Sequence, residues 1–146
     1  VVYGGGGITP DWIIDLPEAT DLQRDLVLKG LFFSFAVHYS AYNDISRAFE
    51  VDDEVLKEFR EFAESKDVEI KEKDWSGENL DFVKTGIKRE IFRKLMGTEG
   101  AYIAALPDDE EFQKVMKMFE ETDSLSEMFE YAKKKTDKEK VAASEE

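Results

Sequence analysis

Two residues in the middle of the chain could in principle form a catalytic pair. His38 is the only histidine, and Ser34 precedes it by four residues, so a hydroxyl and a base would share one face of a helix. A nucleophile and its base on one turn of an apolar helix make an unusual catalytic arrangement, and a single histidine excludes a multi-histidine metal site. We therefore interpret His38 as a buried or half-buried polar residue.

Two further motifs invite a chemical interpretation. Four glycines at residues 4–7 could bring backbone amides close to a phosphate, but the run lacks a Gly-Lys-Ser/Thr ending and no helix follows it directly. The acidic run at 108–111 lacks the glycine and the ligand spacing of a calcium loop. We assign the first to backbone geometry and the second to compensation of a helix dipole. The chain is thus expected to hold no active site, no cofactor and no metal.

Composition narrows the class of protein. The chain has 146 residues with a net charge of −14, 42% hydrophobic residues and 11 Phe, which indicates one folded domain of ordinary size and excludes wholesale disorder. The acidic balance disfavours binding to nucleic acid or to an anionic membrane, and no apolar run is long enough for a membrane span. The absence of cysteine excludes disulfides and thiolate chemistry and leaves the redox compartment open.

Apolar periodicity predicts helices along most of the chain. Residues 22–29 form a helical stretch that Gly30 closes, and residues 31–42 are apolar almost all round, which is typical of a central helix. The clearest helix begins at Ser76, and Gly97 ends or kinks it. The remaining helices are expected at 52–63, 99–106, 108–119 and 124–132.

Extended structure is expected only in short pieces. Residues 1–3 and 12–14 are rich in β-branched and aromatic side chains, and the alternation at 68–71 could form a short strand. The fold class is therefore mainly α, a bundle of about five to six helices with a short extended segment at the N-terminus. We divide the chain into that segment at 1–16, a helical domain at 17–135 and a flexible tail at 136–146.

Charge is distributed unevenly over the expected helices. Residues 52–75 carry a net charge of −5 and residues 107–132 a net charge of −7, whereas residues 76–106 carry +1. Neighbouring helices could therefore pair by charge. The alternative is that these are solvated faces without specific partners, because exposed ion pairs contribute only about 0–1 kcal/mol each.

Several short sequence motifs resemble those of a known family. VYGGGGITPD at residues 2–11 resembles the segment that closes the peptidase core of the carboxyl-terminal processing, or tail-specific, serine peptidases. KGLFFSFAVHY at 29–39, FEVDD at 49–53 and IKREIF at 87–92 are similar to the helical region that follows this core in some bacterial members. The likeness covers roughly residues 1–119, and the Gly-Ile-Thr-Pro-Asp word at 7–11 is its most specific part.

This resemblance carries implications for function. The family cleaves proteins near their C-termini with a serine nucleophile and a lysine base, usually beside a PDZ domain, and both catalytic residues lie upstream of the glycine-rich word. No catalytic residue can thus be assigned here. The resemblance implies a non-catalytic helical domain that serves as a scaffold or oligomerisation surface, in a bacterial periplasmic or cell-envelope serine endopeptidase. Because the chain opens on Val1 without a leader, we expect it to be a piece of that longer protein.

The expected partners are the rest of the peptidase and a second copy of the chain. The extended residues at 1–3 and 12–14 would lack the strands they pair with, and unpaired edges favour dimerisation or strand exchange. A rival hypothesis is a free-standing helical adaptor, whose aromatic helix binds a partner helix or peptide. We expect no nucleic acid and no membrane insertion. The candidate interaction residues under these hypotheses are Val1, Tyr3, Trp12, Ile14, Phe32, Phe33, Phe35 and Tyr39.

Overall fold

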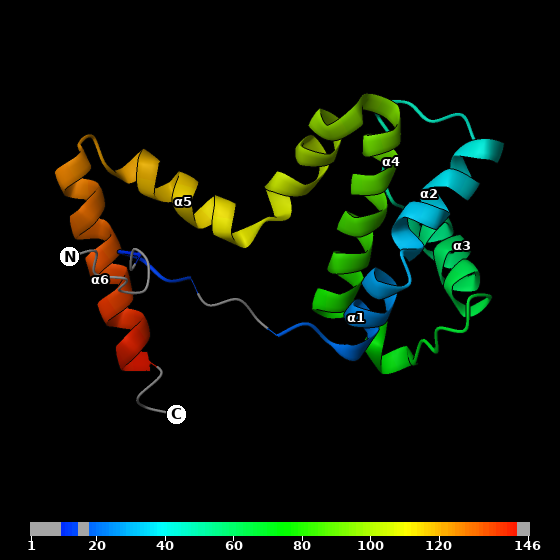
Figure 1. The fold of residues 1–146 in the computed structure, drawn as a ribbon, viewed down its shortest axis with the longest axis horizontal. Coiled ribbons are helices and arrows are strands. Elements are labelled where there is room, and N and C mark those ends of the chain that lie inside the picture. Colours follow the sequence, from blue (N-terminus) through cyan, green and yellow to red (C-terminus); the bar gives the residue numbers. More distant parts are fainter. Residues whose placement is uncertain (1–9, 15–17, 143–146) are drawn as a thin grey trace, which may run out of the picture. The chain divides into compact units, whose positions relative to one another are not determined.

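The computed structural model describes residues 10–14 and 18–142, and this part of the chain is all-helical (Figure 1). It contains no strand, so the prediction of a mainly α fold with five to six helices is confirmed. The helices are α1 (Asp21–Leu28), α2 (Leu31–Tyr42), α3 (Asp53–Glu64), α4 (Gly77–Ala105), α5 (Glu110–Glu121) and α6 (Leu125–Ala142), with short 3₁₀ turns η1 (Glu72–Asp74) and η2 (Leu106–Asp108).

The chain separates into two compact units. One comprises residues 18–109, with α1 to α4, and the other contains α5 and α6 together with the described residues 10–14. In the first unit α2 packs against α1, α3 and α4, which gives it the central position that its apolar sequence predicts. In the second unit α5 packs against α6.

An aromatic cluster forms the centre of the first unit. Phe59 of α3 is fully buried, and its ring stacks on Phe32 at a centroid distance of 5.3 Å and meets Phe35 edge-on at 5.1 Å. Ile87 and Ile91 of α4 are also fully buried. Burying whole aromatic and branched side chains provides most of the stabilisation of such a core, at about 1.5–3 kcal/mol each.

The spacing predicts inward positions for Phe59 and Ala63 of α3 and for Val83, Ile87 and Ile91 of α4, and all five are buried. Leu95, predicted on the same face of α4, is instead 40% exposed and lies two residues before the break in the helix at Gly97.

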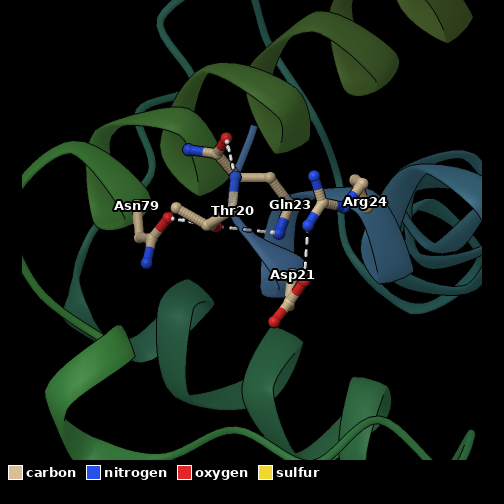
Figure 2. Close-up of polar contacts among 5 residues, drawn as sticks. All are labelled: Thr20, Asp21, Gln23, Arg24 and Asn79. Carbon is tan, nitrogen blue, oxygen red and sulfur yellow. Dashed lines mark hydrogen bonds and ion pairs between the residues drawn. The ribbon is translucent and has the colours of Figure 1, made fainter. Parts of the chain in front are cut away.

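Helix α1 begins with a reciprocal cap at Thr20 (Figure 2). The Thr20 hydroxyl accepts from the backbone N–H of Gln23 at 3.3 Å, and the Gln23 side chain accepts from the backbone N–H of Thr20 at 3.2 Å. The same hydroxyl donates to Oδ1 of Asn79 in the first turn of α4 at 2.8 Å. One side chain thus caps α1 and ties its start to the start of α4.

We expect Thr20→Ala to lower the free energy of unfolding by about 1–2 kcal/mol, because it removes both the cap and the link to Asn79. Urea denaturation followed by circular dichroism measures the change. Thr20→Ser keeps a hydroxyl and should retain most of the stability. An equal loss in the two variants would show that the methyl group, and not the hydrogen bonds, matters.

The junction between α1 and α2 also holds the end of α3. Gly30 has a φ of 62°, a left-handed conformation that suits glycine, and it ends α1 as the sequence predicts. Beside it, Nζ of Lys29 donates to the carbonyl oxygens of Lys66 at 3.1 Å and Asp67 at 2.7 Å. These bonds satisfy carbonyl groups just beyond the last turn of α3 and join the two helical segments.

The predicted strand at 68–71 is wrong. These residues are irregular, although Val68 and Ile70 are both buried, at 3% and 7% exposed. The alternation exists because every second side chain enters the core, and the described part of the chain offers no neighbouring strand to pair with. Residues 12–14, expected to be extended, likewise belong to no regular element, and residues 1–3 lie outside the described residues.

Arg60 of α3 fastens this irregular segment to the helix. Its guanidinium donates to Glu64 at 3.1 Å, to Glu72 at 2.7 Å and to the carbonyl oxygen of Ile70 at 3.3 Å, and it lies 5.8 Å from the centroid of the Trp75 ring. The hydrogen bond from Arg60, and then its charge, lower the pKa of Glu72. The ionised carboxylate is thus favoured in the folded state.

This lowered pKa of Glu72 predicts a pH dependence. Because the pKa of Glu72 is lower in the folded state, its ionised carboxylate stabilises the fold when the pH is above the ordinary glutamate pKa near 4.5. This stabilisation disappears as the pH falls through the folded-state pKa. We expect Glu72→Gln to be less stable than the wild type at neutral pH and equally stable in strong acid. Urea midpoints measured across the acid range test this. A constant gap between the proteins at every pH would contradict it.

Helix α4 bends sharply at Gly97, where φ is 71° and ψ is −155°. The sequence predicts an end or a kink there, and the segment after it turns back closely. A Cβ atom placed on Gly100 would lie 2.3 Å from the carbonyl oxygen of Phe92, so the backbone of the second segment packs directly on the first. Ala101 and Ala104 are buried on this second segment, and their small side chains suit such an approach.

The second unit is much less buried. Helix α5 has no buried residue, and Ala132 of α6 is the one buried side chain among residues 10–14 and 110–136. Ser124 accepts from the backbone N–H of Glu127 at 3.3 Å, as expected of a cap. The helix continues to Ala142, past Lys133, where the loss of apolar periodicity predicts fraying.

Candidate interaction surface

Helix α2 has a buried apolar face and an uncharged outer side. It contains no Asp, Glu, Lys or Arg in twelve residues, and its inner face is buried. On the outer side Phe33 is 63% exposed and Val37 is 45% exposed, one helical turn apart. An uncharged helix with an open apolar face is a feature that marks contact surfaces in folded proteins.

The structure places the predicted interaction residues differently. Phe32 and Phe35 are 4% and 1% exposed and belong to the aromatic core, and Tyr39 is half-buried beside Phe35. Among the predicted interaction residues on α2, Phe33 has an exposed side chain. Trp12 and Ile14 lie in the other unit and are half-buried, whereas Val1 and Tyr3 lie outside the described residues.

The contacts of Trp12 are made within its own unit. Its ring meets that of Tyr131 edge-on at a centroid distance of 5.9 Å, and the carbonyl oxygen of Asp11 accepts from the hydroxyl of Thr136 at 3.3 Å. The indole N–H of Trp12 is buried without a hydrogen-bond partner. Residues near the start of the chain therefore pack on α6.

His38 is exposed, so the interpretation of this residue as buried or half-buried is wrong. The reason is its position on the outer side of α2, where its ring stacks on Phe62 of α3 at 5.7 Å and tilts against Tyr42 at 5.3 Å. It borders a shallow hollow of about 480 Å³ between α2 and α3. The lining residues are Phe35, His38, Glu58, Glu61, Phe62, Ser65 and Lys66.

Three other exposed apolar residues near α2 do not appear among the predicted interaction residues. Val27 and Leu28 at the end of α1 are 54% and 83% exposed, and Tyr42 at the end of α2 is 80% exposed. Leu22 and Leu26 carry the inward face of α1, so helix periodicity alone would have identified Val27 and Leu28 as outward-facing. Tyr42 belongs to α2, whose apolar sequence gives no such signal.

Charged residues of α4 pair mainly within the helix or with a loop. Lys88 donates to both carboxylate oxygens of Glu50, at 3.0 and 2.8 Å, in the segment before α3. Arg89 and Arg93 both donate to Glu90 of the same helix, at 3.2 and 3.1 Å. The expected pairing of neighbouring helices by charge is thus limited here to local bridges on a partly solvated surface.

Ser34 and His38, the pair that could in principle be catalytic, show no contact with each other among the interactions of the described residues. Ser34 and His38 both lie on the exposed side of α2, and the ring contacts of His38 are with aromatic side chains. Within residues 10–14 and 18–142, no three acidic or histidine side chains group as a metal site would require. No helix of the described chain has the length and apolarity to cross a bilayer. What the described surface offers is apolar contact area.

These features define an all-helical domain with an aromatic core and an open apolar face. Residues 22–76 match the family model described as "Probable PDZ-protease, C-terminal helical domain". The matched stretch runs from α1 to the residue before α4 and includes the aromatic helices α2 and α3. The match confirms the resemblance to the C-terminal region of a processing peptidase. Comparison with curated proteins and with solved structures gave no match.

Proposed function

We propose that this chain is the scaffold of a tail-specific serine endopeptidase, a non-catalytic helical domain through which the enzyme assembles. The open, uncharged face of α2 carries the proposal, with Phe33 at 63% and Val37 at 45% exposed. Apolar area of this kind favours association, because its removal from water yields about 25 cal/mol per Å². The family model supports the peptidase context.

The partners in this proposal are the rest of the peptidase and a second copy of the chain. Protein substrates would be reached only through the rest of the enzyme, and a periplasmic or cell-envelope location follows from the resemblance. Because α2 lacks charged side chains, its partner surface would also be apolar, so that no charge is buried unpaired. The rival adaptor would use the same open residues on a foreign helix or peptide.

The coding sequence around this chain separates the proposal from its rival. A peptidase core with a serine nucleophile and a lysine base directly upstream supports the scaffold. A start codon immediately before Val1 would contradict it and favour the adaptor.

Association through α2 can be measured in the full-length protein by light scattering coupled to size exclusion and by limited proteolysis. We expect Phe33→Asp together with Val37→Asp to loosen the assembly and to speed proteolytic release of the helical domain. Tyr102→Asp on α4 is the matched control, because Tyr102 is 60% exposed. Equal behaviour of the two variants would exclude α2 as the contact surface.

A further inference from the structure

Helix α5 carries an apolar strip on a largely exposed side. Phe112, Met116 and Phe119 follow one another at spacings of four and three residues, so they share one side of the helix, and we call these three residues the α5 strip. They are 36%, 39% and 52% exposed. No residue of α5 is buried, although a helix of 12 residues is marginal in water unless its apolar side is covered. The α5 strip therefore has the properties of a contact surface for a further segment.

Negative charge at both ends of the α5 strip indicates the chemistry of that segment. Residues 108–111 are all acidic, and residues 120–123 contain three more acidic residues. Over residues 108–123 there are seven acidic and two basic residues, a net charge of −5. A second copy of the chain would bring the same acidic ends and a net charge of −14. The complementary partner is instead a segment with basic residues at both ends of its own apolar side.

The two lysines of α5 do not neutralise the border of the strip. Lys114 pairs with Glu110 at 3.6 Å, and Lys117 pairs with Glu121 at 3.8 Å. At about 3.6 residues per turn, all four lie on the side of α5 opposite the strip. Glu120 borders the strip one turn after its middle residue. It is exposed, and none of the hydrogen bonds or ion pairs among the described residues involves it.

The composition around the α5 strip favours reversible binding of a separate polypeptide. Three of the four methionines lie in α5 and α6, where Met116 is exposed and Met118 and Met128 are half-buried. The unbranched methionine side chain adapts to partners of different shapes. Contacts that form and dissociate commonly have a charged border, whereas permanent interfaces are more apolar. The uncharged α2 suits a permanent contact within an enzyme, and the α5 strip suits a separate partner.

We propose that the α5 strip binds a cationic amphipathic helix of a separate protein. Apolar side chains of the partner cover Met116 and Phe119, and its basic residues lie at the two acidic ends of α5. The inference goes beyond the proposed function and does not depend on it. The strip belongs to the unit that does not contain α2, and it lies outside the residues 22–76 that match the family model.

Titration with model peptides tests the charge of the partner. The probe is a fluorescent helical peptide of about 14 residues, built from leucine and lysine at amphipathic spacing, and the matched control has glutamate in place of every lysine. We expect the full chain to bind the cationic peptide at least about tenfold more tightly than the anionic one, and salt to weaken this binding. Equal binding of the two peptides would overturn the proposal.

Met116→Ser combined with Phe119→Ser separates the α5 strip from the general acidity of the chain, because it removes apolar area and leaves the net charge unchanged. We expect it to weaken binding of the cationic peptide by about tenfold or more, since apolar anchors dominate such contacts. Phe33→Ser on α2 is the matched control, with a side chain that is 63% exposed, and should bind like the wild type. Equal affinity of the double variant and the wild type would show non-specific attraction and would refute the proposal.

A charge variant tests the same surface without altering its apolar residues. Glu111→Gln combined with Glu120→Gln should weaken peptide binding by about threefold to tenfold, and glutamine preserves the helix propensity of α5. Glu58→Gln combined with Glu61→Gln removes the same charge from exposed positions of α3 in the other unit, and should have a smaller effect. Equal losses in the two variants would contradict binding at α5.

Other occupants of the α5 strip would give different results. A dimer of the full chain in sedimentation experiments that dissociates on Met116→Ser with Phe119→Ser would show that a second copy covers the strip. Peptide binding to this chain that is absent from the full-length protein would show that the rest of the protein covers it. Either result would overturn the inference and leave the contact through α2 to its own test.

Discussion

Phe59→Ala should lower the free energy of unfolding of the first unit by about 3–5 kcal/mol. Phe59 is fully buried, and its ring contacts Phe32 in a stacked geometry and Phe35 edge-on. Truncation removes the transferred apolar area, leaves a cavity and deprives both partner rings of their contact. Because small domains have only about 5–15 kcal/mol in total, this is a large fraction of the stability.

Urea denaturation followed by circular dichroism measures the loss in Phe59→Ala. Phe33→Ala is the matched control, since the same atoms are removed from a side chain that is 63% exposed. We expect this control to change stability by less than about 1 kcal/mol. Equal costs for the two variants would mean that Phe33 is as well covered as Phe59, which would contradict the position of the core.

Gly86→Val should cost about 3 kcal/mol, through overpacking instead of a cavity. A Cβ atom on Gly86 of α4 would lie 2.6, 2.7 and 2.8 Å from three ring carbons of Phe32 on α2. The ring cannot easily retreat, because Phe59 stacks on one side of it and Phe82 meets it edge-on at 5.7 Å. Either the two helices separate or the aromatic cluster rearranges.

A double-mutant cycle with Phe32→Leu tests this explanation. The smaller side chain makes room for a Cβ, so Gly86→Val should be less costly in the Phe32→Leu background than in the wild type. Within a helix, glycine is less favourable than alanine by about 1 kcal/mol. If Gly86 and Phe32 were not in close contact, Gly86→Ala should therefore stabilise the protein. Additive effects in the cycle would refute the close approach of α2 and α4.

Local sequence signals account for much of the fold. Thr20, Asp52 and Gly30 mark helix ends through hydrogen bonds and backbone conformation that involve near neighbours, so their roles could be predicted. The inward positions of α3 and α4 follow from a 3.6-residue period. The alternation of apolar and polar residues at 68–71 led to the wrong prediction of a strand, because Val68 and Ile70 enter the core from an irregular segment.

The candidate surface was only partly predictable. Helix α2 was identified as aromatic and central, but its sequence is apolar in every direction and carries no preferred side. Which aromatic residues are buried depends on α1, α3 and α4, and these cover Phe32 and Phe35 and leave Phe33 open. The same absence of cover on the outer side explains why His38 is exposed.

The sequence alone determined the helical class, several of the helix ends, the excess of acidic charge and the likeness to the helical region of a processing peptidase. Those properties depend on local periodicity, local hydrogen bonding and composition, which a linear chain displays directly. Only the tertiary structure decided which face of α2 is open, how closely Gly86 approaches Phe32, and that α5 and α6 bury so little of their apolar surface. These depend on partners distant in the sequence, and burial is a property of the pair of surfaces in contact.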